Sequence, residues 1–447
     1  MLHKKSLLFS AALLLAATAV NAQNCNSDWL GTKTLYKAPA YHPSVVPAGY
    51  KPVFINHVGR HGARHLTKEV NTSFAWQLLH RADSAKALTA AGQHLWKLVQ
   101  NLTAVEKGQV KSISDEGRDE LRGIGKRMYA HYPSVFTGKV ELNVGYTKEI
   151  RTKQSADAFL QGLKAGFKDS ADVKEYNDDT DLRFYDSSPT YTAFEDGGSW
   201  EKPMNTLRES LKIDVVNHTL AVKWFQPAFL KTLKPAQEDK LVGDVFGFAT
   251  IVYSLQAEIK KAGYQWTDVN FAPLFTCAEQ AALSKLDVAD DYLKKAPGTD
   301  ANGIQVRIAV PLLVNFINTT DEFIKTGKPN AQLRLAHAET IAPFAALLGM
   351  TGADKVAADM KNIEAAWKSS NVIPLSSNIQ WIFYRKAGTT DLLVKFLLNE
   401  KEVHITGLKN ASTYYHWKDV RAFYVNKLNK LNVGLGDDMA AYLKNVK

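Results

Sequence analysis

Three short apolar runs in this sequence are each followed by a charged or ionisable residue and then by a helical pattern. Residues 53–58 form an apolar-rich run, residues 140–146 alternate apolar with polar or small side chains, and residues 333–335 end a third run. Apolar residues at helical spacing follow at 152–167 and 341–348. A strand period that repeatedly gives way to a helical period is typical of an α/β fold. The sequence therefore predicts a mainly parallel sheet flanked by helices.

The residues at these three junctions are of a kind that carries chemistry. The first predicted strand ends just before Arg60 and His61, Arg151 follows the second, and His337 and Glu339 follow the third. In open α/β sheets the ligand crevice lies at the carboxyl ends of the strands. We therefore expect the three junctions to converge on one site, although they are far apart in the sequence.

The segment Arg60-His61-Gly62-Ala63-Arg64 is the sharpest local feature. A histidine between two arginines supplies a nitrogen nucleophile within fixed positive charge, and the glycine lets the backbone approach closely. The alternative is a solvated basic turn, which the preceding strand disfavours. Nearby His57 and His65 have no partners at metal-ligand spacing and are interpreted as structural or rim residues.

A helical segment interrupts the predicted α/β pattern. Residues 190–305 show helical spacing and little strand signal. No repeat, low-complexity tract or Gly/Ser linker is evident, which favours a cap packed on the core over a tethered module. We predict an α/β core of residues 23–189 and 306–447 with a helical cap insertion at 190–305.

The first twenty-two residues have the pattern of a secretory leader. Lys4 and Lys5 precede an almost wholly apolar run at 7–20, and Ala22 is a small residue at the expected cleavage point. A transmembrane anchor needs about 20 unbroken apolar residues, and this run is shorter. A lipid-attachment site is disfavoured by the residues before Cys25. The expectation is a periplasmic or secreted protein without stable membrane insertion.

The net charge and the number of cysteines limit which binding partners and which cellular compartment are expected. Cleavage would remove two lysines and no acids, which lowers the formal charge from +10 to +8 and favours a polyanionic small-molecule partner. Nucleic acid is disfavoured because no run of five basic residues, zinc-knuckle spacing or aromatic RNA-binding signature occurs. The two cysteines, Cys25 and Cys277, allow one disulfide, but the sequence does not decide whether they pair.

These motifs together resemble the histidine phosphatase superfamily, in the branch of acid phosphatases and phytases. The signature of that branch is Arg-His-Gly-x-Arg-x-Pro, and Leu66 stands here at the proline position. Residues 114–117 are similar to the start of the helix that follows the signature loop in that family. Arg151-Thr152 matches the third phosphate-binding arginine of the family.

The segment His337-Ala338-Glu339 points to one subgroup. Most members of the branch carry an aspartate directly after the second histidine, whereas multiple inositol polyphosphate phosphatases carry His-Ala-Glu. Residues 182–186, which include Arg183, as well as Asn378 and residues 398–400, are also similar to that subgroup. The resemblance implies a phosphomonoesterase for inositol polyphosphates such as phytate.

The resemblance also implies a role for each site residue. His61 is the nucleophile and forms a phosphohistidine, Glu339 is the proton donor, and His337 adds a hydrogen-bond donor. The substrate phosphate is bound by Arg60, Arg64 and Arg151. Arg183 either lines the pocket or is an ordinary charged residue at the end of a strand, and the sequence favours neither interpretation. No metal or other cofactor is implied.

Other interpretations stay open at this point. Taken singly, His337 could be a core histidine, and Glu339 could stabilise a helix N-terminus. On the same catalytic frame the protein could be a broad-specificity acid or sugar-phosphate phosphatase, or a phosphotransferase similar to phosphoglycerate mutase. From a different class, it could be an anion-binding protein without turnover, which the combination of His61 and Glu339 disfavours.

Overall fold

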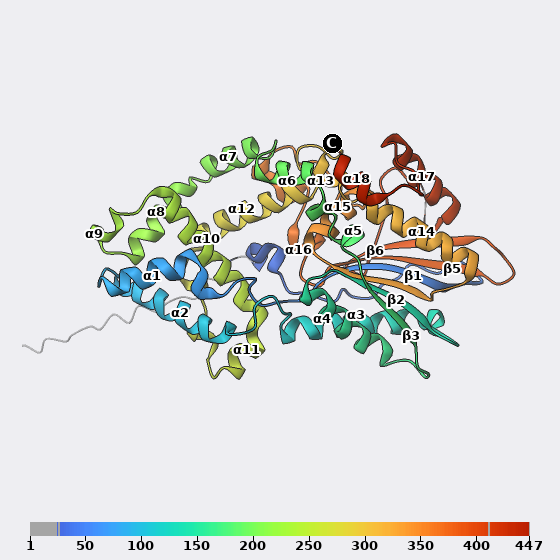
Figure 1. Cartoon of the computed structure of the whole chain (residues 1–447), viewed down its shortest axis with the longest axis horizontal. Coiled ribbons are helices and arrows are strands. Elements are labelled where there is room, and N and C mark those ends of the chain that lie inside the picture. The colour runs from blue at the N-terminus through green and yellow to red at the C-terminus, as the bar shows by residue number, and fades with distance from the viewer. Residues whose placement is uncertain (1–24, 26, 410–411, 447) are drawn as a thin grey trace, which may run out of the picture.

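A computed structural model of the chain describes residues 25, 27–409 and 412–446. The predicted leader at residues 1–22 lies outside them. Figure 1 shows a sheet with helices on both faces, and a group of helices beside its end. None of the helices within the described ranges is both long enough and apolar enough to cross a membrane.

One mixed sheet forms the centre of the α/β part. Its strand order is β3 (Asp172–Asn177), β2 (Glu141–Tyr146), β4 (Ala331–Ala336), β1 (Tyr50–Arg60), β5 (Asn378–Lys386), β6 (Leu392–Leu398) and β7 (Lys401–Val403), and β8 (Tyr415–His416) pairs with β6. From β3 to β1 all pairs are parallel, and the pairs from β1 to β7 are antiparallel. The predicted fold class is confirmed.

The strands bury side chains on both faces of the sheet. In β1, Phe54 packs into the core under α14 (Val310–Thr326) and α15 (Ala338–Leu348), whereas Ile55 packs into the core over α3 (Asp115–His131) and α4 (Ile150–Lys164). β1 runs further than the predicted 53–58, because Arg60 itself pairs with Ala336 of β4. The strand thus carries Arg60 to the carboxyl edge of the sheet. Helix α17 (Trp417–Lys430) covers a face of the sheet, where Trp417 packs against Trp381 and Phe383 of β5.

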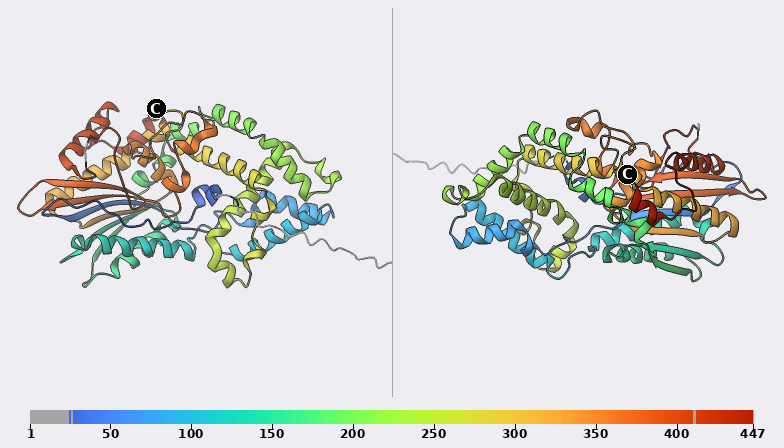
Figure 2. Two further views of the ribbon diagram at one scale, coloured as in Figure 1. Left: turned by 180° about the vertical axis from the view of Figure 1, so that it is seen from behind. Right: turned by 45° about the horizontal axis from the view of Figure 1, so that its top comes forward.

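The helices beside the sheet come from two separate stretches of sequence. Helices α1 (Phe74–Ser84) and α2 (Ala90–Glu106) share one apolar core with α8 (Ile213–Trp224) and α10 (Pro235–Ile251), and Figure 2 shows them grouped from behind and above. The boundaries at 190 and 305 stay a prediction, but α1 and α2 lie outside them and still belong to this helical part. Periodicity could not reveal that, because both stretches are equally helical in pattern.

Helix α12 (Cys277–Lys295) connects the two parts. Leu283 packs in the core of the helical part, whereas Tyr292 and Leu293 pack in the core above the sheet. A disulfide joins Cys277, the first residue of the helix, to Cys25, which answers the question that the sequence left open. Other helices are α5 (Asp179–Leu182), α6 (Pro189–Asp196), α7 (Glu201–Ser210), α9 (Pro227–Leu230), α11 (Gln256–Lys261), α13 (Ile304–Arg307), α16 (Ser369–Val372) and α18 (Met439–Asn445).

Candidate active site

The backbone after β1 is held from several sides. The N–H of His61 donates to the Ala336 carbonyl at 2.9 Å, and the His61 carbonyl accepts from Ser376 N–H at 3.1 Å. Gly62 lies so close to α3 that an added Cβ would meet the Gly117 carbonyl oxygen at 2.6 Å. The glycine of the sequence motif is therefore required by the close packing of the helix against this loop.

The ring of His61 is buried and fixed in one tautomer. Its Nδ1 lies 2.9 Å from the carbonyl oxygen of Gly62, and a carbonyl can only accept, so Nδ1 carries the proton. Burial and then the nearby Arg60 hold the pKa of His61 well below its usual value. The ring is neutral near pH 7, and the unprotonated Nε2 has a lone pair available for attack.

Among the described residues, Arg60 is anchored through its Nη1. Nη1 donates to the carbonyl oxygens of Thr32 at 2.7 Å and Ile373 at 2.6 Å. Among the residues that the structure describes, the buried Nε of Arg60 and the buried Nε of Arg151 have no hydrogen-bond partner. Unsatisfied buried donors are costly, and two of them beside one neutral histidine leave donors available to an acceptor-rich anion.

Arg64 and Leu66 lie where the signature loop passes toward the helical part. Arg64 Nη1 donates to the carbonyl of His65 at 2.8 Å, and burial followed by Arg60 lowers the pKa of Arg64 to about 10. The N–H of Leu66 donates to Glu106 at 3.3 Å. Proline has no N–H, so the departure from the family signature at this position adds a hydrogen bond to the end of α2.

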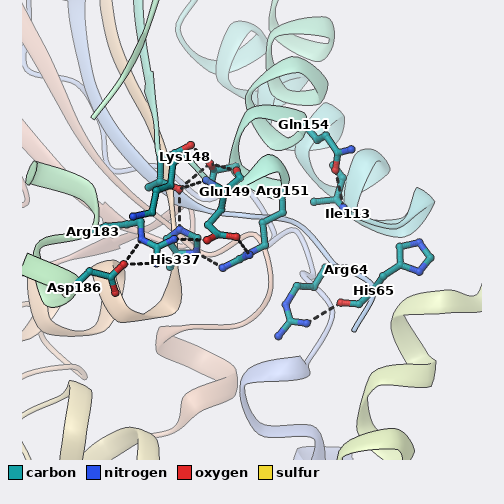
Figure 3. Close-up of polar contacts among 12 residues, drawn as sticks. Arg64, His65, Ile113, Lys148, Glu149, Arg151, Gln154, Arg183, Asp186 and His337 are labelled. Atoms are coloured by element: carbon teal, nitrogen blue, oxygen red, sulfur yellow. Dashed lines mark hydrogen bonds and ion pairs between the residues drawn. The ribbon is translucent and has the colours of Figure 1, made fainter. Parts of the chain in front are cut away.

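Arg151 and Arg183 are joined through one carboxylate, as Figure 3 shows. Glu149 accepts from Arg151 Nη1 at 2.8 Å and from Arg183 Nη1 at 2.7 Å. Arg183 also donates from Nε to Asp186 at 2.7 Å. Arg183 is therefore part of the network around Arg151, at the end of α5.

His337 orients Arg151 and is itself oriented by a hydroxyl group. Arg151 Nη2 lies 3.2 Å from Nδ1 of His337, and a guanidinium can only donate, so Nδ1 is the acceptor. Nε2 therefore carries the proton and lies 2.9 Å from Thr147 Oγ1. Burial, and then Arg151, lower the pKa of His337 to about 3. The rings of His337 and His61 are 5.6 Å apart between centroids, which confirms that these two junctions meet.

Glu339, in the first turn of α15, forms an ion pair with a residue of α12. Its Oε1 lies 3.0 Å from Nζ of Lys295, which also binds Asp291 at 2.7 Å. Burial by itself raises the pKa of Glu339, but Lys295, His337 and a backbone hydrogen bond together outweigh it and hold the pKa well below its usual value. In this structure the carboxyl is therefore ionised at any pH near neutrality.

Three residues of the site were missed at the level of sequence. Glu149 and Thr147 lie beside Arg151 in the chain, and their proximity to that arginine was the only available signal. Lys295 ends a helix in which Asp290 and Asp291 are spaced for pairs with Lys294 and Lys295. Such pairs are usual on solvated helix faces, so nothing in the pattern indicated that one of them faces the site.

The fold and this site define a class of protein. A neutral, buried histidine with a ring of arginines lies at the carboxyl ends of the parallel strands of the mixed sheet, and residues 53–399 match the histidine phosphatase superfamily (branch 2). The chain belongs to this superfamily, as the sequence motifs predicted.

Particular relatives can be named within that class. Multiple inositol polyphosphate phosphatase 1 of Gallus gallus is 24% identical over 442 residues, which cover 93% of each chain. The structure is similar to the multiple inositol polyphosphate phosphatase of Bifidobacterium longum in complex with inositol hexasulfate, with a TM-score of 0.76, 21% identity and coverage of 88% of this chain and 97% of that one. The phytase of D. castellii gives a TM-score of 0.60 at 13% identity, with coverage of 93% and 89%.

Proposed function

We propose that this protein hydrolyses phosphate monoesters through a phosphohistidine on His61, and that inositol polyphosphates are its substrates. One observation carries the proposal. A neutral histidine with a free Nε2 lies beside Arg60 and Arg151, whose buried Nε donors lack partners within the described part of the chain. A tetrahedral phosphate would accept from both arginines and lie within reach of the nucleophile.

In the first half of the reaction, Nε2 of His61 attacks phosphorus, the N–P bond forms and the bond to the alkoxide oxygen breaks. Arg60, Arg64 and Arg151 would neutralise charge on the equatorial oxygens, which is the main task in phosphoryl transfer. The Gly62 carbonyl keeps the proton on Nδ1 and stabilises the positive charge that develops on the ring. His337 holds Arg151 in place, because its unprotonated Nδ1 accepts a hydrogen bond from Arg151 Nη2.

Glu339 would carry the protons of both halves of the reaction. As an acid it protonates the departing alkoxide, and as a carboxylate it then takes a proton from the water that attacks the phosphohistidine. The second attack breaks the N–P bond, releases inorganic phosphate and restores neutral His61. The cycle is balanced, because the proton given to the alcohol is recovered from water.

The choice of substrate rests on charge and on the relatives. Three of them are named as multiple inositol polyphosphate phosphatases or phytase, and one was solved with inositol hexasulfate. Phytate has six phosphates, each with a second pKa near ~6, so five of them must lie outside the arginine site. Arg183 and Lys295 are cations at its rim.

We also infer that the protein is exported to the periplasm or secreted. The leader pattern of residues 1–22 supports this, and so does the Cys25–Cys277 disulfide, since disulfides persist in oxidising compartments. Edman sequencing of protein from the extracellular fraction is expected to begin near Gln23.

The proposed substrate is tested by comparing kcat/KM for phytate and for glycerol phosphate in purified protein. We expect a clear preference for phytate at low ionic strength that narrows as salt is added, because long-range attraction is screened. His61→Ala serves as the control for contaminating phosphatases. Equal efficiency on both substrates at low salt would favour a broad-specificity acid phosphatase, and no release from either would favour an anion-binding protein.

A further inference from the structure

The proposed proton donor is paired with a cation in the unliganded protein. Lys295 Nζ lies 3.0 Å from Glu339, and the side chain of Lys295 is only 16% exposed. A general acid must be protonated to act, and a lysine beside it opposes protonation. The free protein therefore holds Glu339 in the form that cannot protonate a leaving group.

Lys295 is placed so that it can change partners. It has three N–H donors, and Asp291, one turn earlier on α12, anchors it at 2.7 Å. Leu293 of the same helix packs in the core above the sheet, so the backbone that carries Lys295 is fixed. The side chain of Glu339 is 33% exposed, so a bound substrate can approach this ion pair from solvent.

The other groups that face Glu339 come from several elements. The cations Arg60 and Arg64 and the neutral His337 are on its substrate side. Tyr185, Tyr191 and Glu195 lie toward α6. Of these groups and Lys295, only Lys295 is joined to Glu339 by an ion pair within the described residues. It is therefore the group whose movement changes the protonation of Glu339 most.

We propose that Lys295 is a positioning residue that releases Glu339 and binds a neighbouring phosphate of the bound substrate instead. Glu339 can then take up the proton that it delivers to the leaving group. This inference rests on the proposed function and deepens it. When a vicinal phosphate arrives, Lys295 keeps Asp291 and turns its remaining donors to the phosphate. The phosphate adds about −1.5 to −2 charges near Glu339, which favours protonation as well.

Substrates with a neighbouring phosphate are therefore favoured in the chemical step over those without one. Glu339 takes one proton from solvent on binding and passes it to the inositol oxygen as the P–O bond breaks. A monoester without a neighbouring phosphate leaves Lys295 on Glu339, so its leaving group departs without an acid. The contact with the second phosphate is thus used in the transition state, and it raises kcat rather than only lowering KM.

The test compares phytate with an inositol monophosphate, which share the ring and the leaving-group oxygen. In Lys295→Met we expect kcat/KM for phytate to fall ~10- to 100-fold, the range for one hydrogen bond to a charged group. For the monophosphate we expect kcat/KM near neutral pH to rise, because Lys295 no longer holds Glu339 as a carboxylate. The alkaline limb of its pH profile should move to higher pH, because the pKa of Glu339 is no longer lowered by Lys295. Lys295→Arg should restore much of the preference for phytate.

The matched control is Lys294→Met, because Lys294 is on the same helix, pairs with Asp290 and lies over the ring of Trp200. It should behave as wild type on both substrates. An equal loss on both substrates in Lys295→Met, or an unchanged pH profile on the monophosphate, would overturn the inference. Failure of wild-type protein to hydrolyse phytate would instead overturn the proposed function.

Discussion

Two buried arginines on neighbouring strands have opposite surroundings. Arg334, within β4, is fully buried, and all three of its guanidinium nitrogens are bonded: Nη1 to Asn56 at 2.6 Å, Nε to Asn315 at 3.0 Å and Nη2 to Thr319 at 3.2 Å. Its plane also lies over Phe316. Arg60, at the end of β1, is anchored through Nη1, and its Nε has no partner among the described residues.

The difference separates a structural arginine from a binding one. Amide, hydroxyl and backbone oxygens accept from every guanidinium nitrogen of Arg334, so no donor is left to attract a ligand, and removing it would leave acceptors buried without donors. Arg60 is held on one side and unsatisfied on the other, which is the arrangement expected where an anion completes the site. Position along the strand causes the contrast, because only the strand end opens onto the crevice.

The largest effect is expected at the strand-end site itself, from removal of its nucleophile. His61→Ala should lower the rate of phytate hydrolysis by at least ~10⁴-fold, as for other covalent nucleophiles. Because the arginines remain, the variant should still bind inorganic phosphate in a calorimetric titration and unfold at nearly the wild-type temperature. His94→Ala, on an exposed face of α2, is the control and should be fully active. Activity within tenfold of wild type in His61→Ala would exclude His61 as nucleophile.

A smaller effect is expected when the arginines stay and the proton donor is removed. Glu339→Gln should slow hydrolysis of inositol phosphates by ~10²- to 10⁴-fold, which is the usual contribution of a general acid. Nitrophenolate leaves without much protonation, so the phosphorylation step on nitrophenyl phosphate should lose less. Single-turnover measurements on both substrates would show this, and equal losses would contradict the acid role.

The arginine comparison is tested directly with one substitution at each site. Arg60→Met should lower kcat/KM by ~10²- to 10³-fold, the range for one transition-state donor. Its loss of unfolding free energy should be smaller than that of Arg334→Met, because only the carbonyls of Thr32 and Ile373 lose a donor and a buried unsatisfied Nε is removed as well. Arg334→Met should instead lower the unfolding free energy by ~2–4 kcal/mol through unsatisfied Asn56 and Asn315. Urea denaturation and kinetics on both variants separate the two effects. If Arg60→Met is the less stable protein, the distinction fails.

The smallest effect concerns a carboxyl pair where α3 meets α11, close to the site. Burial, and then Glu258 as a like charge, raise the pKa of Glu116 to about 7. The contribution of Glu116 to folding is present below pH 4.5 and is lost as the pH rises through about 7, because the folded chain holds the proton more tightly. Glu116→Gln should therefore gain ~1–2 kcal/mol relative to wild type between pH 5 and 8, after allowance for solvent screening. The exposed Glu209→Gln is the control, and a gain that does not depend on pH would contradict the assignment.

The sequence predicted those parts of the fold and site that depend on strand ends. The change of period placed Arg60, His61, Arg151 and the His337 segment on one edge, and the structure has them there. Lys295 could not be predicted, because a Lys-Asp pair four residues apart on a helix looks the same whether it faces solvent or a site. The burial of Arg334 could not be predicted either, because one charged residue between Leu333 and Leu335 fits an ordinary alternating strand whose polar side chains face solvent. The surroundings of both residues depend on tertiary packing, which cannot be read from the local sequence pattern.

The pairing of β1 with β4 has a consequence for how the protein reaches its working state. Asn56 and Arg334, which bond across this pair, are 278 residues apart, and chains dominated by such distant contacts fold slowly. The helices can form early from local interactions, but the loop of His61 rests on the Ala336 carbonyl and on Ser376 N–H. The nucleophile therefore gains its support only when the last third of the chain has arrived. In a refolding experiment the return of hydrolysis would lag behind the return of helical circular dichroism and would report the closing of the sheet.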